Sequence, residues 1–148
     1  MAKAVDVWKI LWDVLEYKFF TGVAHKGFDA LYGKMNPKNM HYIPAVNARA
    51  ALGIAAGTSV NGVKSGVFLV DTFLGTFVEE YNNFIKSLDV SFLVFVYNSS
   101  GKKIKAPVGI PLITFSEDNY EEKLVTFDKK IIKHKKPGII VLEEGIIE

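Results

Sequence analysis

The amino-acid sequence predicts an α/β protein in which a mainly parallel sheet lies between two layers of helices. Two observations carry this prediction. Short apolar runs alternate along the chain with longer segments of helical spacing, as in folds built from successive strand and helix units. The apolar runs are nearly continuous, which is typical of strands buried on both faces of a sheet. At 148 residues, the chain is expected to form one domain over residues 1–148.

An amphipathic helix opens the chain, because apolar side chains recur at helical spacing while Lys9, Asp13 and Glu16 lie on the other side. The apolar positions of this helix are Trp8, Leu11, Trp12, Leu15 and Phe19. After it, short apolar runs predict strands, and segments of helical pattern between them predict helices. The strands of this half are expected near 19–23, 40–45 and 65–70, and the helices near 26–35 and 47–61.

The second half of the chain continues the alternation. Turn-forming residues and lysines over 98–107 predict a surface loop. Asp118 and Glu121 form a capping-box signal for the start of a further helix, which is expected to end before Pro137. The remaining elements of this half are a helix near 73–88 and strands near 91–97 and 138–143.

Composition limits the classes of function. A net charge of +2 creates no strong field for nucleic acid, and the basic run 129–136 lies in the last turns of a helix, where cations complement the helix dipole. The absence of cysteine excludes disulfides and thiolate chemistry. No apolar run approaches the roughly 20 residues of a membrane span, and acidic residues interrupt the N-terminal segment. We therefore expect a cytoplasmic chain with neither a nucleic-acid nor a membrane partner.

The stretch NARAALGIAAG, at 47–57, is the most distinctive of the sequence. It contains Asn47, the only arginine of the chain (Arg49), and a run of small residues. One interpretation is a helix capped by Asn47 and packed closely on the sheet through Gly53, Gly57, Ala51 and Ala55. The other is a ligand-binding edge, and the two are compatible. Arg49 is then either a solvent or interface cation or a ligand contact.

Three segments carry a resemblance to a known family: TGVAHKGFDALYGKM (21–35), HYIPAVNARAALGIAAGTSVNGVKSGVFLV (41–70) and KKPGIIVLEEG (135–145). They resemble the pyrimidine-binding domain of thiamine-diphosphate enzymes, and most closely the alpha-subunit branch of the sulfopyruvate and phosphonopyruvate decarboxylases. The resemblance implies a three-layer α/β/α thiamine-diphosphate-binding fold. It also implies that the cofactor would contact Gly22, Val23, Asn47, Ala48, Asp71, Leu74 and Gly75.

The chain departs from this family at its chemical centre. In the family, the residue after the asparagine is a glutamate that bonds the cofactor's pyrimidine ring and so promotes loss of the thiazolium proton; here it is Ala48. A methyl group cannot do this, and neither Arg49 nor Ala50 replaces the acid. The resemblance therefore implies a lyase-type decarboxylase site that is degenerate, with impaired or no activity and no catalytic residue that can be assigned.

The diphosphate-binding half of such a cofactor site is also absent from this sequence. The family holds the cofactor's diphosphate and magnesium on a partner domain with a Gly-Asp-Gly motif, which this sequence lacks. The resemblance thus implies a homo-oligomer and a separate diphosphate-binding subunit, which would supply the magnesium if thiamine diphosphate binds at all. We also expect Trp8 and Trp12 to serve as aromatic anchors of a subunit contact.

Several polar residues stay open to two interpretations. His25 and Lys26 follow the first strand, where a carboxylate, phosphonate or sulfonate could bind together with Arg49, or they form an ordinary polar loop. Asp71 is either a candidate acid or the cap of the next helix. His41 and His134 show no metal-ligand spacing, so no metal site is expected.

Two classes of function therefore remain. One is a subunit related to sulfopyruvate or phosphonopyruvate decarboxylase, with activity impaired at Ala48 or retained by a mechanism that does without the glutamate. The alternative is a non-catalytic binding or assembly protein that keeps the fold for its interfaces. A neighbouring reading frame that encodes the Gly-Asp-Gly half would favour an enzyme.

Overall fold

A computed structural model describes residues 1–35 and 41–148 of the chain. Its centre is one six-stranded sheet in the order β2-β1-β3-β4-β6-β5, in which every pair of neighbouring strands is parallel. The strands are β1 (Phe19–Gly22), β2 (His41–Pro44), β3 (Ser65–Val70), β4 (Leu93–Tyr97), β5 (Leu112–Thr114) and β6 (Gly138–Leu142). The predicted parallel sheet is confirmed. Met40, where the second strand was expected to begin, lies outside the described residues.

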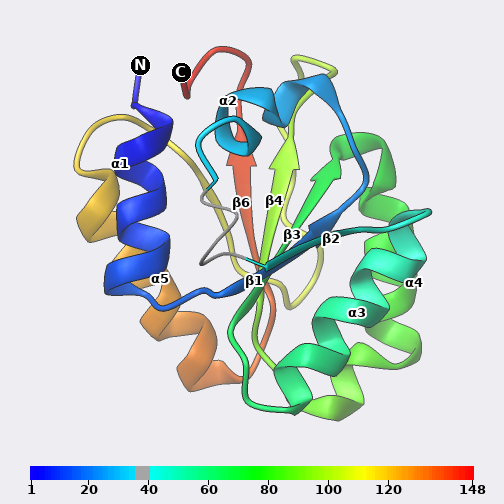
Figure 1. The fold of residues 1–148 in the computed structure, drawn as a ribbon. Helices are drawn as coiled ribbons and strands as arrows, with labels where there is room; N and C mark the ends of the chain where they lie inside the picture. The colour runs from blue at the N-terminus through cyan, green and yellow to red at the C-terminus, as the bar shows by residue number, and fades with distance from the viewer. Residues whose placement is uncertain (36–40) are drawn as a thin grey trace.

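Helices cover both faces of the sheet. One layer contains α1, α2 and α5, and the other contains α3 and α4 (Figure 1). The helices are α1 (Ala4–Lys9), which continues as a π-helical turn (Ile10–Val14), then α2 (Asp29–Tyr32), α3 (Ala48–Val60), α4 (Leu74–Asn83) and α5 (Tyr120–His134). The three-layer α/β/α class predicted from the sequence is therefore confirmed.

The core consists of two apolar clusters, one on each face of the sheet. In β3, the side chain of Phe68 enters the cluster under α1, α2 and α5, while Val67 and Leu69 enter the cluster under α3 and α4. The ring of Phe68 lies 5.8 Å from that of Phe20 and 5.1 Å from that of Phe95, centroid to centroid. Aromatic contacts thus join three adjacent strands on the first face.

The opening helix is shorter than its apolar pattern predicts. It ends at Val14, and Glu16 then takes a left-handed conformation, so Phe19 belongs to β1. Trp8 is only 2% exposed, and its indole Nε1 donates a hydrogen bond of 2.7 Å to the carbonyl oxygen of Leu31. The expectation that Trp8 anchors a subunit contact is wrong, because this side chain is already buried within its own chain.

The second half of the sheet differs from expectation in two places. β5 was not predicted, since three residues at a sheet edge give almost no periodic signal. The capping box at Asp118 is wrong: α5 begins at Tyr120, after Asn119 in a left-handed conformation, and no side chain caps it. The helix does end before Pro137, with Lys135 in the left-handed region.

A buried polar triad ties the layers together below the amino ends of the strands. The Asp128 carboxylate of α5 accepts a hydrogen bond of 2.5 Å from the Tyr17 hydroxyl and one of 2.8 Å from the Lys64 ammonium group. Tyr17 precedes β1 and Lys64 precedes β3. Burial and the neighbouring Asp128 charge raise the pKa of Tyr17 well above its ordinary value, so the hydroxyl remains a donor.

Replacement of the shared acceptor should destabilise the fold. Asp128→Ala would leave the Tyr17 hydroxyl buried without a partner, so we expect the free energy of unfolding to fall by about 2 kcal/mol or more. Lys129→Ala, an exposed neighbour on the same helix, should change it by about 0.5 kcal/mol or less. Urea unfolding followed by circular dichroism measures both variants, and equal losses would contradict the role assigned to the triad.

Candidate functional site

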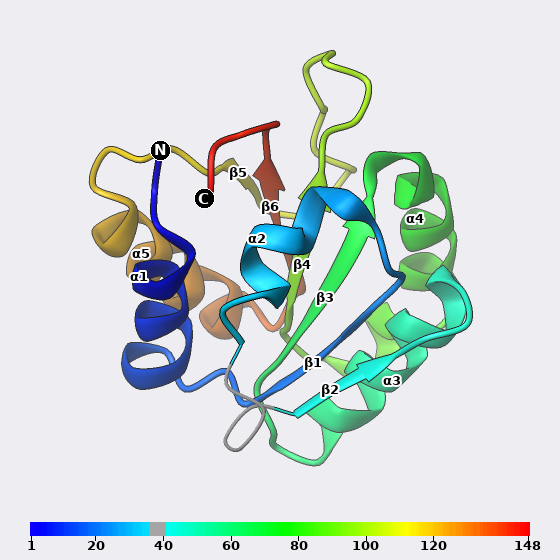
Figure 2. The ribbon, with the colours of Figure 1, turned by 45° about the horizontal axis from the view of Figure 1, so that its top comes forward.

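The strand order indicates a candidate ligand-binding edge at the carboxyl ends of β1 and β3. The chain runs outward from β1 to β2 and then returns to β3 on the other side of β1, so the order of strands reverses between β1 and β3. Open parallel sheets bind ligands beyond the carboxyl ends of the strands at such a point. The segments that follow β1, β2 and β3 at this edge are 23–26, 45–49 and 71–75 (Figure 2). They contain nearly all the predicted site residues.

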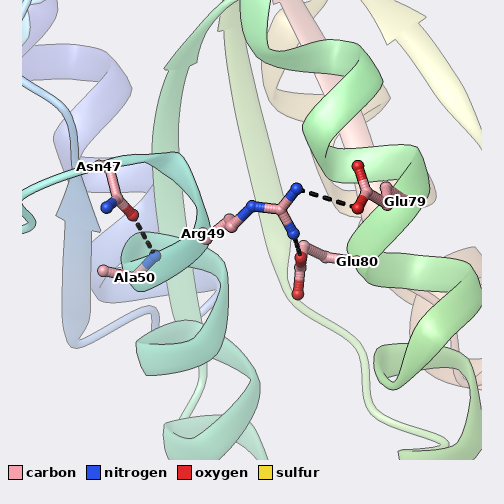
Figure 3. Close-up of polar contacts among 5 residues, drawn as sticks. All are labelled: Asn47, Arg49, Ala50, Glu79 and Glu80. Carbon is pink, nitrogen blue, oxygen red and sulfur yellow. Dashed lines mark hydrogen bonds and ion pairs between the residues drawn. The ribbon is translucent and has the colours of Figure 1, made fainter.

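The first turn of α3 is a capped helix start without an acid. The Asn47 side-chain oxygen accepts a hydrogen bond of 2.9 Å from the backbone N–H of Ala50, as the capping interpretation predicts (Figure 3). Ala48 is only 3% exposed and packs in the apolar cluster under α3 and α4. No acidic residue lies in this turn. The position thus offers a ligand no carboxylate.

Arg49 is paired within the chain. One guanidinium nitrogen contacts the Glu79 carboxylate at 2.9 Å, and another contacts that of Glu80, so the side chain bridges α3 and α4 (Figure 3). Hydrogen bonding and charge attraction from Glu79, supported by Glu80, raise the pKa of Arg49. The two carboxylates at least balance the positive charge of Arg49, so Arg49 is a weaker contact for an anionic ligand.

The segment after β1 crosses the sheet edge and lies against β4. A Cβ atom on Gly27 would come within 2.5 Å of the Tyr97 ring. The centroid of the His25 ring lies 5.2 Å from that of the Tyr97 ring. The His25 Nδ1 accepts a hydrogen bond of 2.9 Å from the backbone N–H of Gly27. Of the two predicted cations, Lys26 is the more exposed side chain.

Asp71 holds the loop that follows β4. Its carboxylate accepts hydrogen bonds from the Ser99 hydroxyl at 2.5 Å and the Ser100 backbone N–H at 3.3 Å. It caps no helix, so that interpretation is wrong. Partial burial raises the pKa of Asp71, but the bonds from Ser99 and Ser100 outweigh this and leave it below its ordinary value. Asp71 is thus a charged acceptor rather than a proton donor near neutral pH.

A polar network at the same edge was missed from the sequence. The buried Asn98 amide donates to both oxygens of Glu143, at 3.1 and 3.2 Å, and to the Lys102 carbonyl at 2.7 Å. Asn98 directly follows β4 and Glu143 directly follows β6. That placement is the signal that could have identified them, because parallel strands bring their carboxyl ends to one edge.

The glycines of this region have different roles. A Cβ atom on Gly22 would lie 2.6 Å from the Phe68 carbonyl oxygen, so close strand packing requires glycine there. Gly53, Gly57 and Gly75 face open space. The expected close packing of α3 is confirmed for Ala51 and Ala55 and wrong for Gly53 and Gly57. The buried residues of the helix are Ala48, Ala51, Leu52, Ala55 and Ala56.

A surface hollow with a volume of about 700 Å³ lies away from this edge, between α1 and the start of α5. Carboxylates such as those of Asp6, Asp13 and Glu121 line it. Within residues 1–35 and 41–148, no three His, Asp or Glu side chains are grouped to hold a metal ion. Nor does any described helix combine the length and apolar character that a membrane span requires.

No protein-family model matches the chain, and no curated protein sequence does so either. Among solved structures, the chain is similar to 2-oxoglutarate:ferredoxin oxidoreductase from Magnetococcus marinus, determined with 2-oxoglutarate, coenzyme A and succinyl-CoA bound. The TM-score is 0.69 at 13% sequence identity, and the match covers 99% of this chain and 29% of that one. The fold therefore recurs as one part of a longer enzyme chain.

Asp71 provides a pH test of this edge. A lowered pKa means that its bonds to Ser99 and Ser100 contribute stability above the ordinary value of 3.8 and lose it as the pH falls through the lowered pKa. The backbone amide resonance of Ser100 should therefore titrate with a midpoint below 3.8 and remain unchanged above it. In Asp71→Asn this titration should vanish. A midpoint above 3.8 in the unmodified protein would contradict the assigned contacts.

Proposed function

We propose that the chain is a pyrimidine-domain-like subunit of the thiamine-diphosphate-enzyme type that lacks the group needed to activate the cofactor. Two findings support the class: the three-layer fold with its parallel sheet, and the match of the whole chain to part of an enzyme that binds a 2-oxo acid. The decarboxylases that the sequence resembles also act on 2-oxo acids. This shared substrate chemistry supports a 2-oxo acid as the substrate class that we propose for the family site.

The burial of Ala48 is the observation that supports the proposed lack of cofactor activation. Ala48 occupies the position of the family glutamate on the resemblance, and its methyl group is buried in an apolar cluster. Acids elsewhere at this edge are already engaged, Glu79 and Glu80 by Arg49, and Asp71 by Ser99 and Ser100. The residues present therefore do not fit the task of holding and protonating a pyrimidine ring, and we assign no catalytic step to this chain.

Binding without activation remains part of the proposal. Thiamine diphosphate, if bound, would lie against the backbone of the three segments at the switch edge, with its magnesium supplied by a partner. The contacts carried over from the family are Gly22, Val23, Asn47, Ala48, Asp71, Leu74 and Gly75. An anionic group would depend mainly on Lys26, since the Nδ1 of His25 accepts a backbone bond and Arg49 faces two acids.

Partner domains or subunits belong to this function. The chain spans 29% of the length of the oxidoreductase chain that it matches, so the remainder of such an enzyme has no counterpart here. We propose a homo-oligomer that docks a separate diphosphate-binding subunit. The second candidate, a non-catalytic assembly protein, is favoured by one specific observation: the only arginine of the chain and two acids of α4 form a bridge between helices rather than a free polar site.

Activity measurements test the proposal directly. With thiamine diphosphate and Mg²⁺, the chain should show no cofactor-dependent decarboxylation of pyruvate, sulfopyruvate or phosphonopyruvate, because positioned acid–base groups typically contribute about 10²–10⁴ in rate. Release of CO₂ should be measured for the chain alone and for any complex that it forms in its native cells. Cofactor-dependent turnover that requires this chain would overturn the proposal.

Restoring the family acid should be costly for the isolated chain. Ala48→Glu would place a carboxylate in an apolar cluster, so we expect the free energy of unfolding to fall by about 2 kcal/mol or more. Ala50→Glu is the matched control in the same turn, where an acid is only partly buried and favoured by the helix dipole. Thermal unfolding compares the two. Equal stability of both variants would show that position 48 is open enough for a ligand-facing acid.

A further inference from the structure

The outer edge of β5 has backbone groups that no neighbouring strand satisfies. β5 is an edge strand, paired only with β6. The Pro111 carbonyl accepts a hydrogen bond from Ile139 N, and Phe115 N donates to the Val141 carbonyl, so residues 111 and 115 turn their polar groups toward β6. Because direction alternates along a strand, Leu112 and Thr114 turn their N–H and C=O groups away from the sheet. This edge can accept another strand.

A groove runs beside this edge. It has a volume of about 510 Å³ and is lined by residues of β5 and of one stripe of α5. Ile113 and Phe127 form its floor, and Thr126 lies at the middle of the stripe. Ile113 pairs in register with Ile140, a residue of the core on the α5 face, so the groove continues the apolar surface of that layer. An added strand would therefore gain both backbone bonds and apolar contact.

The charges that line the groove are ordered for self-association. Glu122 and Lys130 stand at equal sequence distances on either side of Thr126 and both face the groove. When two antiparallel copies of a helix pack about Thr126, Glu122 of each copy therefore meets Lys130 of the other. The order of charges is therefore complementary to itself, which favours a second copy of the chain as the occupant.

The backbone of β5 is compatible with the same two-fold symmetry. A two-fold axis through Ile113 pairs Leu112 of one copy with Thr114 of the other, in both directions. These are the residues whose N–H and C=O groups face outward, so each pair can exchange both hydrogen bonds of an antiparallel ladder. Ile113 then meets its own counterpart on the face covered by α5. Each of these two pairings has a two-fold axis, one through Ile113 and one through Thr126, and both residues line the same groove, so one axis can serve both.

We propose that this groove is a homodimer interface, in which β5 pairs antiparallel with its symmetry mate and two Glu122–Lys130 ion pairs join the α5 helices. The interface lies at the opposite edge of the sheet from β2. It is independent of the cofactor question and adds a specific surface to the proposed homo-oligomer. The same axis brings Lys123 near Lys129 of the other copy, so repulsion there limits the affinity.

Charge exchange tests the interface. Glu122→Lys and Lys130→Glu each convert two attractive pairs into two repulsive ones, so each variant alone should dimerise about tenfold or more weakly than the unmodified chain. An equimolar mixture of the two variants restores every pair and should form heterodimers. Lys123→Glu, which removes the repulsion with Lys129, should tighten the dimer. Sedimentation velocity at several concentrations measures all four cases.

Each outcome is decisive. Loss of dimer in both single variants, with recovery in the mixture, supports the interface, and the exposed control Lys86→Glu, which follows α4 on the other face of the sheet, should leave assembly nearly unchanged. An unmodified chain that stays monomeric at high micromolar concentration overturns it. Dimers indifferent to all these substitutions also overturn it, while leaving the proposed oligomer at another surface intact. Circular dichroism confirms that each variant is folded, since every changed side chain is exposed.

Discussion

Burial of β3 and β4 on both faces is the constraint on which the rest of this structure depends. Their side chains alternate between two apolar clusters, so helices must cover the sheet on each side, and each crossover must return to start the next strand parallel to the last. All carboxyl ends therefore meet at one edge. The candidate site is a consequence of this packing: it lies where the chain reverses its direction across the sheet, between β1 and β3.

Several charged groups at this edge already bind other groups of the chain, while Lys26 stays exposed. Arg49 is matched by Glu79 and Glu80, and Asp71 by the backbone and hydroxyl groups of the next loop. Here the side-chain contacts hold α3 to α4 and one loop to another. These contacts within the chain support the proposed assembly role, or binding of the cofactor without activation, over acid–base catalysis.

The sequence was informative where local pattern and tertiary structure agree. Continuous apolar runs located five strands, and Asn47 identified the start of α3, because a side-chain cap is a local interaction. The sequence was uninformative where contacts between distant parts of the chain determine how a side chain is placed. Gly53 and Gly57 face outward because the sheet selects the alanine face of α3, and Trp8 is buried because α2 supplies an acceptor from another part of the chain. The partners of Arg49 and Asp71 come from other elements, so spacing alone could not find them.

Our central proposal is that this chain has a fold of the thiamine-diphosphate-enzyme type without the means to activate the cofactor. Exchange of the thiazolium C2 proton of thiamine diphosphate for deuterium reports activation before any substrate reacts. It should be followed by proton NMR with Mg²⁺ present, for the purified chain and for its native complex. We predict an exchange rate equal to that of the free cofactor in the same buffer. An acceleration that disappears when this chain is removed would contradict the claim.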